Sequence, residues 1–273
     1  MNEAINKHTL TRKDVRLGQP ASPGIARLTA GAAAINQGQS EVKSAAFGGL
    51  LSNRMLARLP GEDFARLLPY LEPVALTAGH YLYGLGNKVD YIYFPETAVI
   101  SHMHLLEDGN TTEVALVGKE GMTGLSAVFN APPTSYWSQV IIGGSALRVE
   151  IGVITEDFYR AEAMQGLVLN YASERIAQIS QRAVCNGRHT LQERLATWLL
   201  MIHDRAGDGQ MLLTHEEIAR HLGARRASIS VAANLLRDGR IIGYNRGHLR
   251  ILDRAALRSA ACECYETLAR YNA

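Results

Sequence analysis

The side chains with the most specific chemistry lie in residues 213–242, which read LTHEEIARHLGARRASISVAANLLRDGRII. Arg226 can donate two hydrogen bonds to guanine O6 and N7, and Asn234 suits adenine. Ala227 and Val231 offer apolar surface that suits the methyl group of thymine. One bidentate cation, one amide and small apolar groups together are typical of a surface that reads base edges.

These side chains act together only if one helix places them on one face. A helical wheel over residues 226–238, at about 100° per residue, separates two faces. The face expected to pack inward consists of Ile229, Ala232, Ala233 and Leu236. The face expected to enter a major groove consists of Arg226, Ala227, Ser230, Val231 and Asn234. Ser228 lies on another flank, where it could bind a phosphate.

A second, shorter helix must precede this one. Thr214 followed by Glu217 is a capping box, and Gly223 can take the left-handed conformation that ends a helix. Two helices joined by so short a turn predict a helix-turn-helix, with an ordinary helical hairpin as the alternative. Thr214 and His215 could contact phosphate at the start of the first helix. The turn before Arg226 ends in Arg225 and lacks a capping side chain, so free N–H groups there suit a phosphate oxygen.

The residues after the second helix predict a wing. Residues 241–244 and 248–252 read as strands around the turn Asn245-Arg246-Gly247. Arg246 at the tip is a candidate for phosphate or minor-groove contact, or simply an exposed cation. Residues 220–258 hold nine arginines against Asp238 and Asp253, a balance of 9 − 2 = +7. Such a block suits a polyanionic partner, although a solvated surface can also be charged.

Short strands dominate the middle of the chain. Candidate strands are residues 81–83, 91–94, 99–106, 113–117, 138–142 and 146–151, separated by glycine-containing turns. Their number and spacing predict a small antiparallel barrel or roll. A helical segment over residues 50–71, broken at Pro60-Gly61, precedes them.

A long helix over residues 155–185 follows, and then a helix over residues 190–203, with an interruption at Gly187. An apolar stripe with steps of four and three residues runs along the long helix: Val168, Ala172, Ile176, Ile179 and Ala183. The stripe is narrow, like a coiled-coil seam, and predicts a homodimer. The alternative is an ordinary helix whose stripe faces the core of its own chain.

The predicted fold class is therefore α+β, in four parts. We expect a flexible arm over residues 1–45, with a short helix as the alternative, a β-roll domain over 46–158, the dimerisation helix over 159–187, and a winged helix-turn-helix domain over 188–273. Of the 273 residues, 47% are hydrophobic and 20% charged, which is a globular composition. No apolar run is long enough for a membrane span, and no secretory signal is visible, so we expect a cytoplasmic protein.

The remaining reactive side chains point to no catalytic or metal site. Cys262 and Cys264, with His248, could be imagined as metal ligands, but alternate positions on a helix point apart, and an ordinary tail is expected. His102 and His104 share one face of a strand and are expected to be half-exposed histidines rather than ligands. No nucleophile elbow, Walker motif or dinucleotide glycine motif is present. We therefore expect no enzyme activity, no metal and no cofactor.

In residues 50–268 the chain resembles the bacterial regulators related to the cyclic-AMP receptor protein and Fnr. The resemblance rests on the order of parts and on the strings FPETAVIS, LEDGNTTEVALVGKEGMTG, LQERLATWLLMIHDR and LGARRASISVAANLLRDGRII. It implies a cyclic-nucleotide-binding-like β-roll and a homodimer that binds palindromic double-stranded DNA. It also implies regulation of transcription, with RNA polymerase as a partner.

Two departures from the family pattern matter. Arg226 matches the first base-reading arginine, but Ala227 replaces a glutamate and Val231 a second arginine, so the operator should differ. The sensor segment, residues 121–144, lacks the arginine that holds a cyclic phosphate. A different effector could use the space lined by Met122, Thr123, Tyr136 and Trp137, or these side chains could simply fill it.

The expected function is a homodimeric, sequence-specific DNA-binding transcription regulator. The rival is a sensor and interaction module whose winged helix docks a protein partner. The block of arginines, with Arg226 and Asn234 facing outward, favours DNA.

Overall fold

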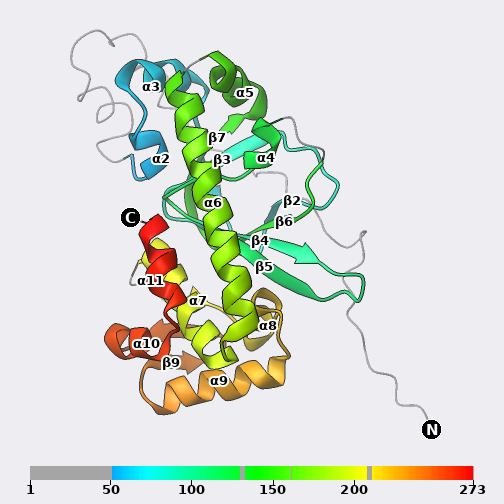
Figure 1. Cartoon of the computed structure of the whole chain (residues 1–273), viewed down its shortest axis with the longest axis vertical. Helices are drawn as coiled ribbons and strands as arrows, with labels where there is room; N and C mark the ends of the chain where they lie inside the picture. Colours follow the sequence, from blue (N-terminus) through cyan, green and yellow to red (C-terminus); the bar gives the residue numbers. More distant parts are fainter. Residues whose placement is uncertain (1–50, 130–132, 161, 208–210, 273) are drawn as a thin grey trace.

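A computed structural model describes residues 51–129, 133–160, 162–207 and 211–272. The expected N-terminal arm, residues 1–45, lies outside the described residues. The fold is α+β, as predicted: two antiparallel sheets, a long helix and a winged helix-turn-helix follow one another along the chain (Figure 1). Among the described residues, no helix is both long and apolar enough to cross a membrane.

The N-terminal part is a β-roll of two sheets, with strand orders β1-β7-β3 and β2-β6-β4-β5. The strands are β1 Glu72–Leu76, β2 Tyr81–Tyr83, β3 Tyr91–Pro95, β4 Val99–Leu105, β5 Thr111–Val117, β6 Trp137–Ile142 and β7 Gly144–Glu150. Short helices flank them: α2 Arg54–Ala57, α3 Gly61–Leu67, the 3-10 turn Leu68–Tyr70 and α4 Leu125–Val128. Pro60 caps α3, which agrees with the predicted break at this proline.

The sequence did not predict β1. This strand pairs only with β7, contains Pro73 and has no fully buried residue, so it is an edge strand with little apolar alternation. Proline is tolerated at a sheet edge because a missing N–H costs no ladder bond there. The pattern that identifies a strand is weakest in this position.

The predicted long helix is two helices, α5 Ile151–Arg160 and α6 Glu162–Arg188. Gly187 was expected to interrupt the helical structure, but it lies inside α6. A β-carbon added there would meet open space. A glycine costs about 1 kcal/mol within a helix, which packing over the rest of α6 can offset. The following helix, α7 Leu191–Ala206, begins after Thr190, which caps it together with Glu193.

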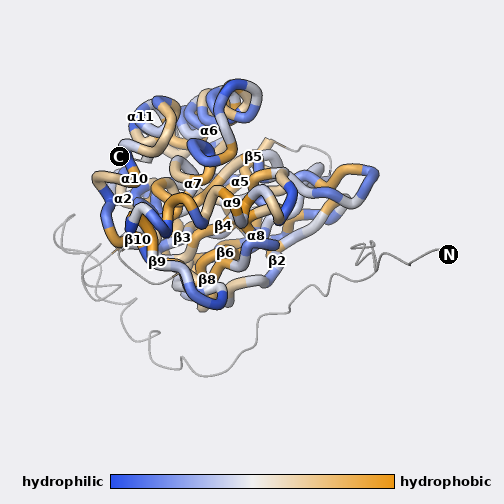
Figure 2. The backbone as a smooth tube through the Cα atoms, turned by 90° about the horizontal axis from the view of Figure 1, so that it is seen from below, coloured by the Kyte–Doolittle hydropathy of each residue, from blue (hydrophilic) through white to orange (hydrophobic). Residues whose placement is uncertain are grey.

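The C-terminal part encloses α7 within a winged domain. It contains β8 Met211–Leu212, α8 His215–Leu222, α9 Arg226–Asp238, β9 Ile242–Asn245, β10 His248–Ile251, α10 Arg254–Ala260 and α11 Cys264–Ala269. The core includes Trp198 and Leu199 of α7, both with no exposed area, and Ile229 of α9. Seen from below, the apolar stretches of α7 lie at the middle of this domain (Figure 2).

A buried carboxylate joins the three parts of the molecule. Glu113 on β5 accepts hydrogen bonds from Ser101 Oγ of β4 (2.8 Å), Arg182 Nη2 of α6 (3.0 Å) and Trp198 Nε1 of α7 (3.0 Å). His221 Nδ1 of α8 lies 3.2 Å from the same carboxylate. Burial raises the pKa of Glu113, but the hydrogen bond from His221 and the charge of Arg182 outweigh it, so the pKa lies below its ordinary value. The roll, the long helix and the helix-turn-helix therefore share one ionised hub.

Candidate DNA interface and dimer face

The two helices of the helix-turn-helix begin and end where the sequence predicts. Thr214 and Glu217 form the capping box of α8, in which each side chain bonds the other residue's backbone N–H. Gly223 ends α8 in the left-handed conformation, with φ 58° and ψ 44°. Arg225, the residue before α9, makes no capping hydrogen bond through its side chain. The first turn of α9 thus has no side-chain cap, as its sequence implies.

Helix α9 separates its two faces as predicted. The inward set is buried: Ile229, Ala232, Ala233 and Leu236. On the opposite face Arg226, Ala227, Val231 and Asn234 are exposed, and Val231 keeps 63% of its surface accessible. Ser228 is exposed on the adjoining flank. Solvent-facing alanine and valine next to arginine and asparagine are available to contact base edges.

His215 and Ser230, two predicted DNA contacts, are bonded to each other. His215 Nδ1 lies 2.9 Å from Ser230 Oγ, which donates to the carbonyl of Arg226 at 3.1 Å. The His215 ring also stacks on Tyr244 of the wing, with centroids 4.4 Å apart and planes at 14°. Ser230 accepts from Nδ1 when that nitrogen carries the proton, a tautomer that satisfies both bonds. Their evident role is to join the start of α8, α9 and the wing, so their contact with DNA remains only a prediction.

The wing is a two-residue hairpin whose tip is Arg246. Asn245 pairs with His248, and the residues between them, Arg246 and Gly247, have φ of 49° and 84°. Two positive φ values are required by the primed type I turn that suits a twisted hairpin. The exposed Arg246 side chain therefore lies at the end of the wing, as predicted.

Five of the nine arginines in residues 220–258 are exposed and make no ion pair with any described residue. Arg237, Arg254 and Arg258 pair with carboxylates. The unpaired and exposed ones are Arg225, Arg226, Arg240, Arg246 and Arg250. They lie at the start of α9, just after it, and on the wing. Positive charge without an internal partner is available to a polyanion.

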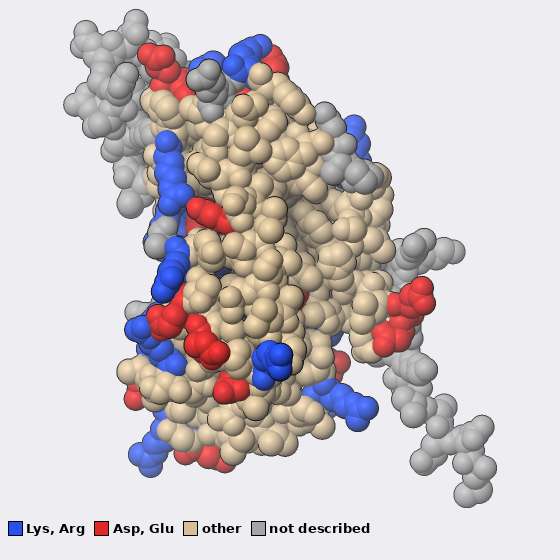
Figure 3. All heavy atoms as spheres, viewed as in Figure 1, with Lys and Arg blue, Asp and Glu red and all other residues tan. Residues whose placement is uncertain are grey.

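The long helix has an exposed apolar face, but Val168 does not belong to it. Val168 has no exposed area and packs in the core below α6, whereas its neighbour Leu169 is 50% exposed. Ile176 and Ile179 are 67% and 43% exposed. The outward stripe is therefore Leu169, Ala172, Ile176, Ile179 and Ala183, with steps of three and four, in which Ala172 is half-buried and the others are exposed. Along the line that α6 follows in Figure 1, the surface in Figure 3 is mostly uncharged.

The candidate effector residues are packed rather than open. Met122 and Thr123 are buried, Thr123 bonds the backbone of Tyr93, and Tyr171 donates to the Met122 carbonyl at 3.0 Å. The two aromatic rings are packed as well: Tyr136 stacks on His102, and the edge of Trp137 meets Tyr81. A cleft of about 750 Å³ lies elsewhere, beside α4 and α5, and none of the four predicted residues lines it.

Of the two strand histidines that were expected to be half-exposed, only His102 differs from the expectation. His102 is buried and His104 is half-buried, and both lie beside Tyr136, with ring centroids 4.5 and 6.2 Å away. Burial, with the positive charge of Arg175, lowers the pKa of His102 well below its ordinary value. His102 is therefore a neutral part of the roll interior.

Comparison with known proteins assigns the DNA-binding part. Residues 193–260 match the family model of the Crp-like helix-turn-helix domain, which spans α7, α8, α9 and the wing. The chain therefore contains a Crp-like helix-turn-helix domain. No curated protein matches this chain.

Solved structures share the fold of this chain. FixK2 from Bradyrhizobium japonicum is 21% identical with a TM-score of 0.60, and the match covers 70% of this chain and 98% of that one. A putative Crp/Fnr transcriptional regulator from Eubacterium rectale is 15% identical with a TM-score of 0.61, covering 76% and 96%. A transcriptional regulator of the CRP family from Thermus thermophilus is 21% identical with a TM-score of 0.57, covering 70% and 96%. At these identities the likeness concerns the fold alone.

Proposed function

We propose that the chain is a transcription regulator of the Crp/Fnr type, a homodimer that binds a palindromic operator through its two winged helices. The observation that carries the proposal is the outer face of α9, where the unpaired Arg226 and the exposed Asn234 flank Ala227 and Val231. A guanidinium, an amide and methyl groups on one helix face form the set that major-groove readout uses. Thr214, Arg225, Ser228 and Arg246 surround this face and would contact phosphates.

Each part of the molecule would have its own role. The β-roll would sense or transmit a signal, α6 would dimerise, and residues beyond Arg188 would read DNA. The Glu113 hub offers a physical connection, because it holds β5, α6, α7 and α8 together. A cytoplasmic location and contact with RNA polymerase would follow from this role.

The rival function is a module whose winged helix docks a protein. Salt dependence of DNA binding separates the two. If Arg225, Arg246 and the other cations around this face bind phosphates, log K should fall linearly with log salt, by about 0.9 for each phosphate contacted. Fluorescence anisotropy on genomic fragments between low and physiological salt measures the slope. A flat slope, or no binding at low salt, would favour the protein-docking module.

A further inference from the structure

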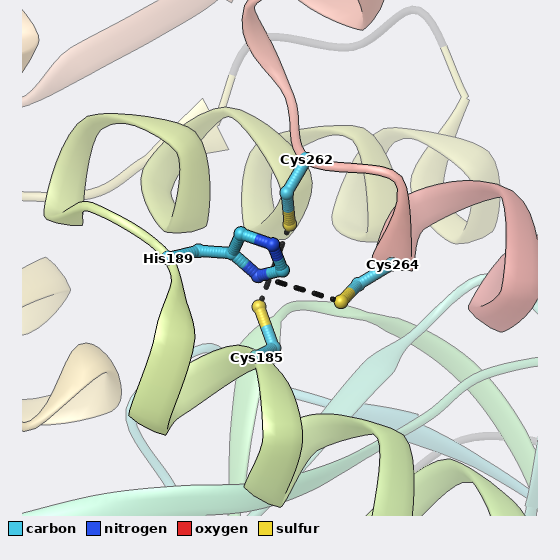
Figure 4. A group of neighbouring side chains, drawn as sticks. All are labelled: Cys185, His189, Cys262 and Cys264. Atoms are coloured by element: carbon cyan, nitrogen blue, oxygen red, sulfur yellow. Dashed lines mark hydrogen bonds between the residues drawn. The ribbon is translucent and has the colours of Figure 1, made fainter.

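The three cysteines of the chain and one histidine converge at the end of the long helix. Cys185 and His189 come from the last turn of α6 and the residue after it, whereas Cys262 and Cys264 come from the segment that enters α11. All four point toward one another (Figure 4). The thiol of Cys185 lies 3.5 Å from that of Cys262, and the thiol of Cys264 lies 3.5 Å from His189 Nδ1. The four ligand atoms all lie within 4.8 Å of one another.

The structure differs from the reasoning that led us to expect an ordinary C-terminal tail. That expectation assumed that Cys262 and Cys264 lie on one helix and point apart, but α11 begins only at Cys264. Ala261, just before the pair, is extended with φ −83° and ψ 158°, so the chain approaches the cluster before it becomes helical. His248, the histidine considered from the sequence, lies on β10 and is not part of the cluster.

The spacing and donor types fit one tetrahedral metal ion. With metal–sulfur bonds of about 2.3 Å, tetrahedral ligand atoms lie about 3.8 Å apart, close to the observed separations. Cys185 and His189 are four residues apart, which places their side chains on one side of a helical turn. Three sulfurs and one imidazole nitrogen are the donor set of structural zinc sites.

Surrounding polar groups complete the site. The other ring nitrogen of His189, Nε2, lies 3.2 Å from the Glu263 carboxylate. A carboxylate in this position fixes the tautomer that leaves Nδ1 free for a metal. Gln181 Nε2 donates to the Cys264 sulfur at 3.0 Å, and Thr197 Oγ1 lies 3.2 Å from the Cys262 sulfur. Hydrogen-bond donors directed at sulfur suit thiolates.

We propose that Cys185, His189, Cys262 and Cys264 bind one zinc ion, which staples the segment before α11 to the end of α6. Each ligating thiol releases its proton on binding, so three thiolates, one neutral imidazole and Zn²⁺ leave a net charge of −1. The staple spans the junction at which α6 passes into α7 and the winged domain. The inference does not depend on DNA binding.

A disulfide between Cys185 and Cys262 is the competing use of the cluster. It would need an oxidant, and it accounts for only two of the four converging groups. Neither Cys264 nor the Glu263–His189 contact has a role in it. A zinc site accounts for all four groups and also for the Glu263 carboxylate that contacts His189.

The full chain, purified under reducing conditions without chelators, is tested by elemental analysis and by titration of the metal-stripped protein with Zn²⁺ and Co²⁺. We expect one zinc per chain and, with Co²⁺, the visible absorption of a tetrahedral thiolate site. Cys264→Ser and His189→Ala should lose the metal, whereas His80→Ala, at an exposed histidine of the roll, should retain it. Glu263→Gln should weaken affinity about 10–100-fold, and Glu266→Gln should not.

The titration of the unaltered protein decides the matter even if a variant fails to fold. Absence of zinc together with no Zn²⁺ or Co²⁺ binding by the reduced protein would overturn the proposal. Iron with sulfide in place of zinc would also overturn it, as would a Cys185–Cys262 disulfide that persists in the purified protein and excludes metal.

Discussion

Arg226 is the residue on which base selectivity should depend most. It lies exposed at the start of α9 without a described ion-pair partner, so its guanidinium is free to bond a base edge. Arg226→Ala should lower affinity for the operator by about 1–3 kcal/mol and relax selectivity at one base pair in each half-site. Competition binding against a library of operator variants measures both effects.

Arg246→Ala is the matched control for Arg226. Its side chain lies at the wing tip, where it would contact backbone or the minor groove, so binding should weaken about equally for all sequences. Equal losses on operator and random DNA for Arg226→Ala would contradict its assignment to base reading.

Local periodicity was enough to predict the faces of α9, because each residue's face depends on its position along one helix. The predictions for His215 and Ser230 were less informative for a physical reason. Their mutual bond and the Tyr244 ring come from three elements that only tertiary packing brings together. The cysteine cluster was missed for the same reason, since Cys185 and His189 are remote in sequence from Cys262 and Cys264.

At the scale of elements, the exposed face of α6 should be the dimer seam. Ile176 is 67% exposed at its centre, and Ile176→Glu would bury a charge on each side of the seam. The cost should be about 3–5 kcal/mol, enough to give monomers at micromolar concentration. Light scattering measures the molar mass of the particle in solution. DNA affinity should fall when the dimer is lost.

Tyr70→Glu is the control for the seam, because Tyr70 is 56% exposed but belongs to the 3-10 turn after α3 and not to α6. It should leave the dimer intact. An Ile176→Glu variant that stays dimeric would show that the subunits meet through another surface.

The β-roll should not use cyclic AMP or cyclic GMP through the phosphate site of the family. Residues 121–144 contain no arginine or lysine, and an ion pair at about 4 Å is worth about 4 kcal/mol at an effective dielectric of about 20. Losing it lowers affinity roughly 10³-fold. Met122 and Thr123 are buried, and neither of them lines the cleft beside α4 and α5.

Isothermal titration of the purified dimer with both nucleotides tests this prediction, and no micromolar binding is expected. A micromolar dissociation constant together with tighter operator binding would show that the pocket lies elsewhere in the roll.

Periodicity predicted most strands and helices, but it did not show where the long helix divides or which of two adjacent residues faces outward. Val168 and Leu169 are adjacent, and both fit a stripe with steps of three and four, so only packing shows which one faces outward. The edge strand β1 and the glycine inside α6 are tolerated because neighbouring structure offsets their poor propensity.

At the scale of the whole molecule, Glu113 should hold the parts together. Glu113→Ala leaves Arg182, the Trp198 N–H and His221 without their shared acceptor. Breaking a buried pair on one side costs about 3–5 kcal/mol, so the free energy of unfolding should fall by this amount. Urea denaturation measures it.

The control is Glu107→Ala, at an exposed carboxylate in the turn between β4 and β5. It should change stability little, because exposed charges contribute at most about 1 kcal/mol. A Glu113→Ala variant as stable as this control would contradict the role of the hub.

Genome-wide DNA footprinting with the tagged protein tests the central claim most directly. A dimer joined through α6 with α9 in the major groove predicts protected sites that share one inverted repeat, with half-site centres about 34 Å apart. The same sites should lose selective protection in Arg226→Ala. Protection without a common sequence, or over a single unrepeated half-site, would contradict a dimer that reads a palindromic operator.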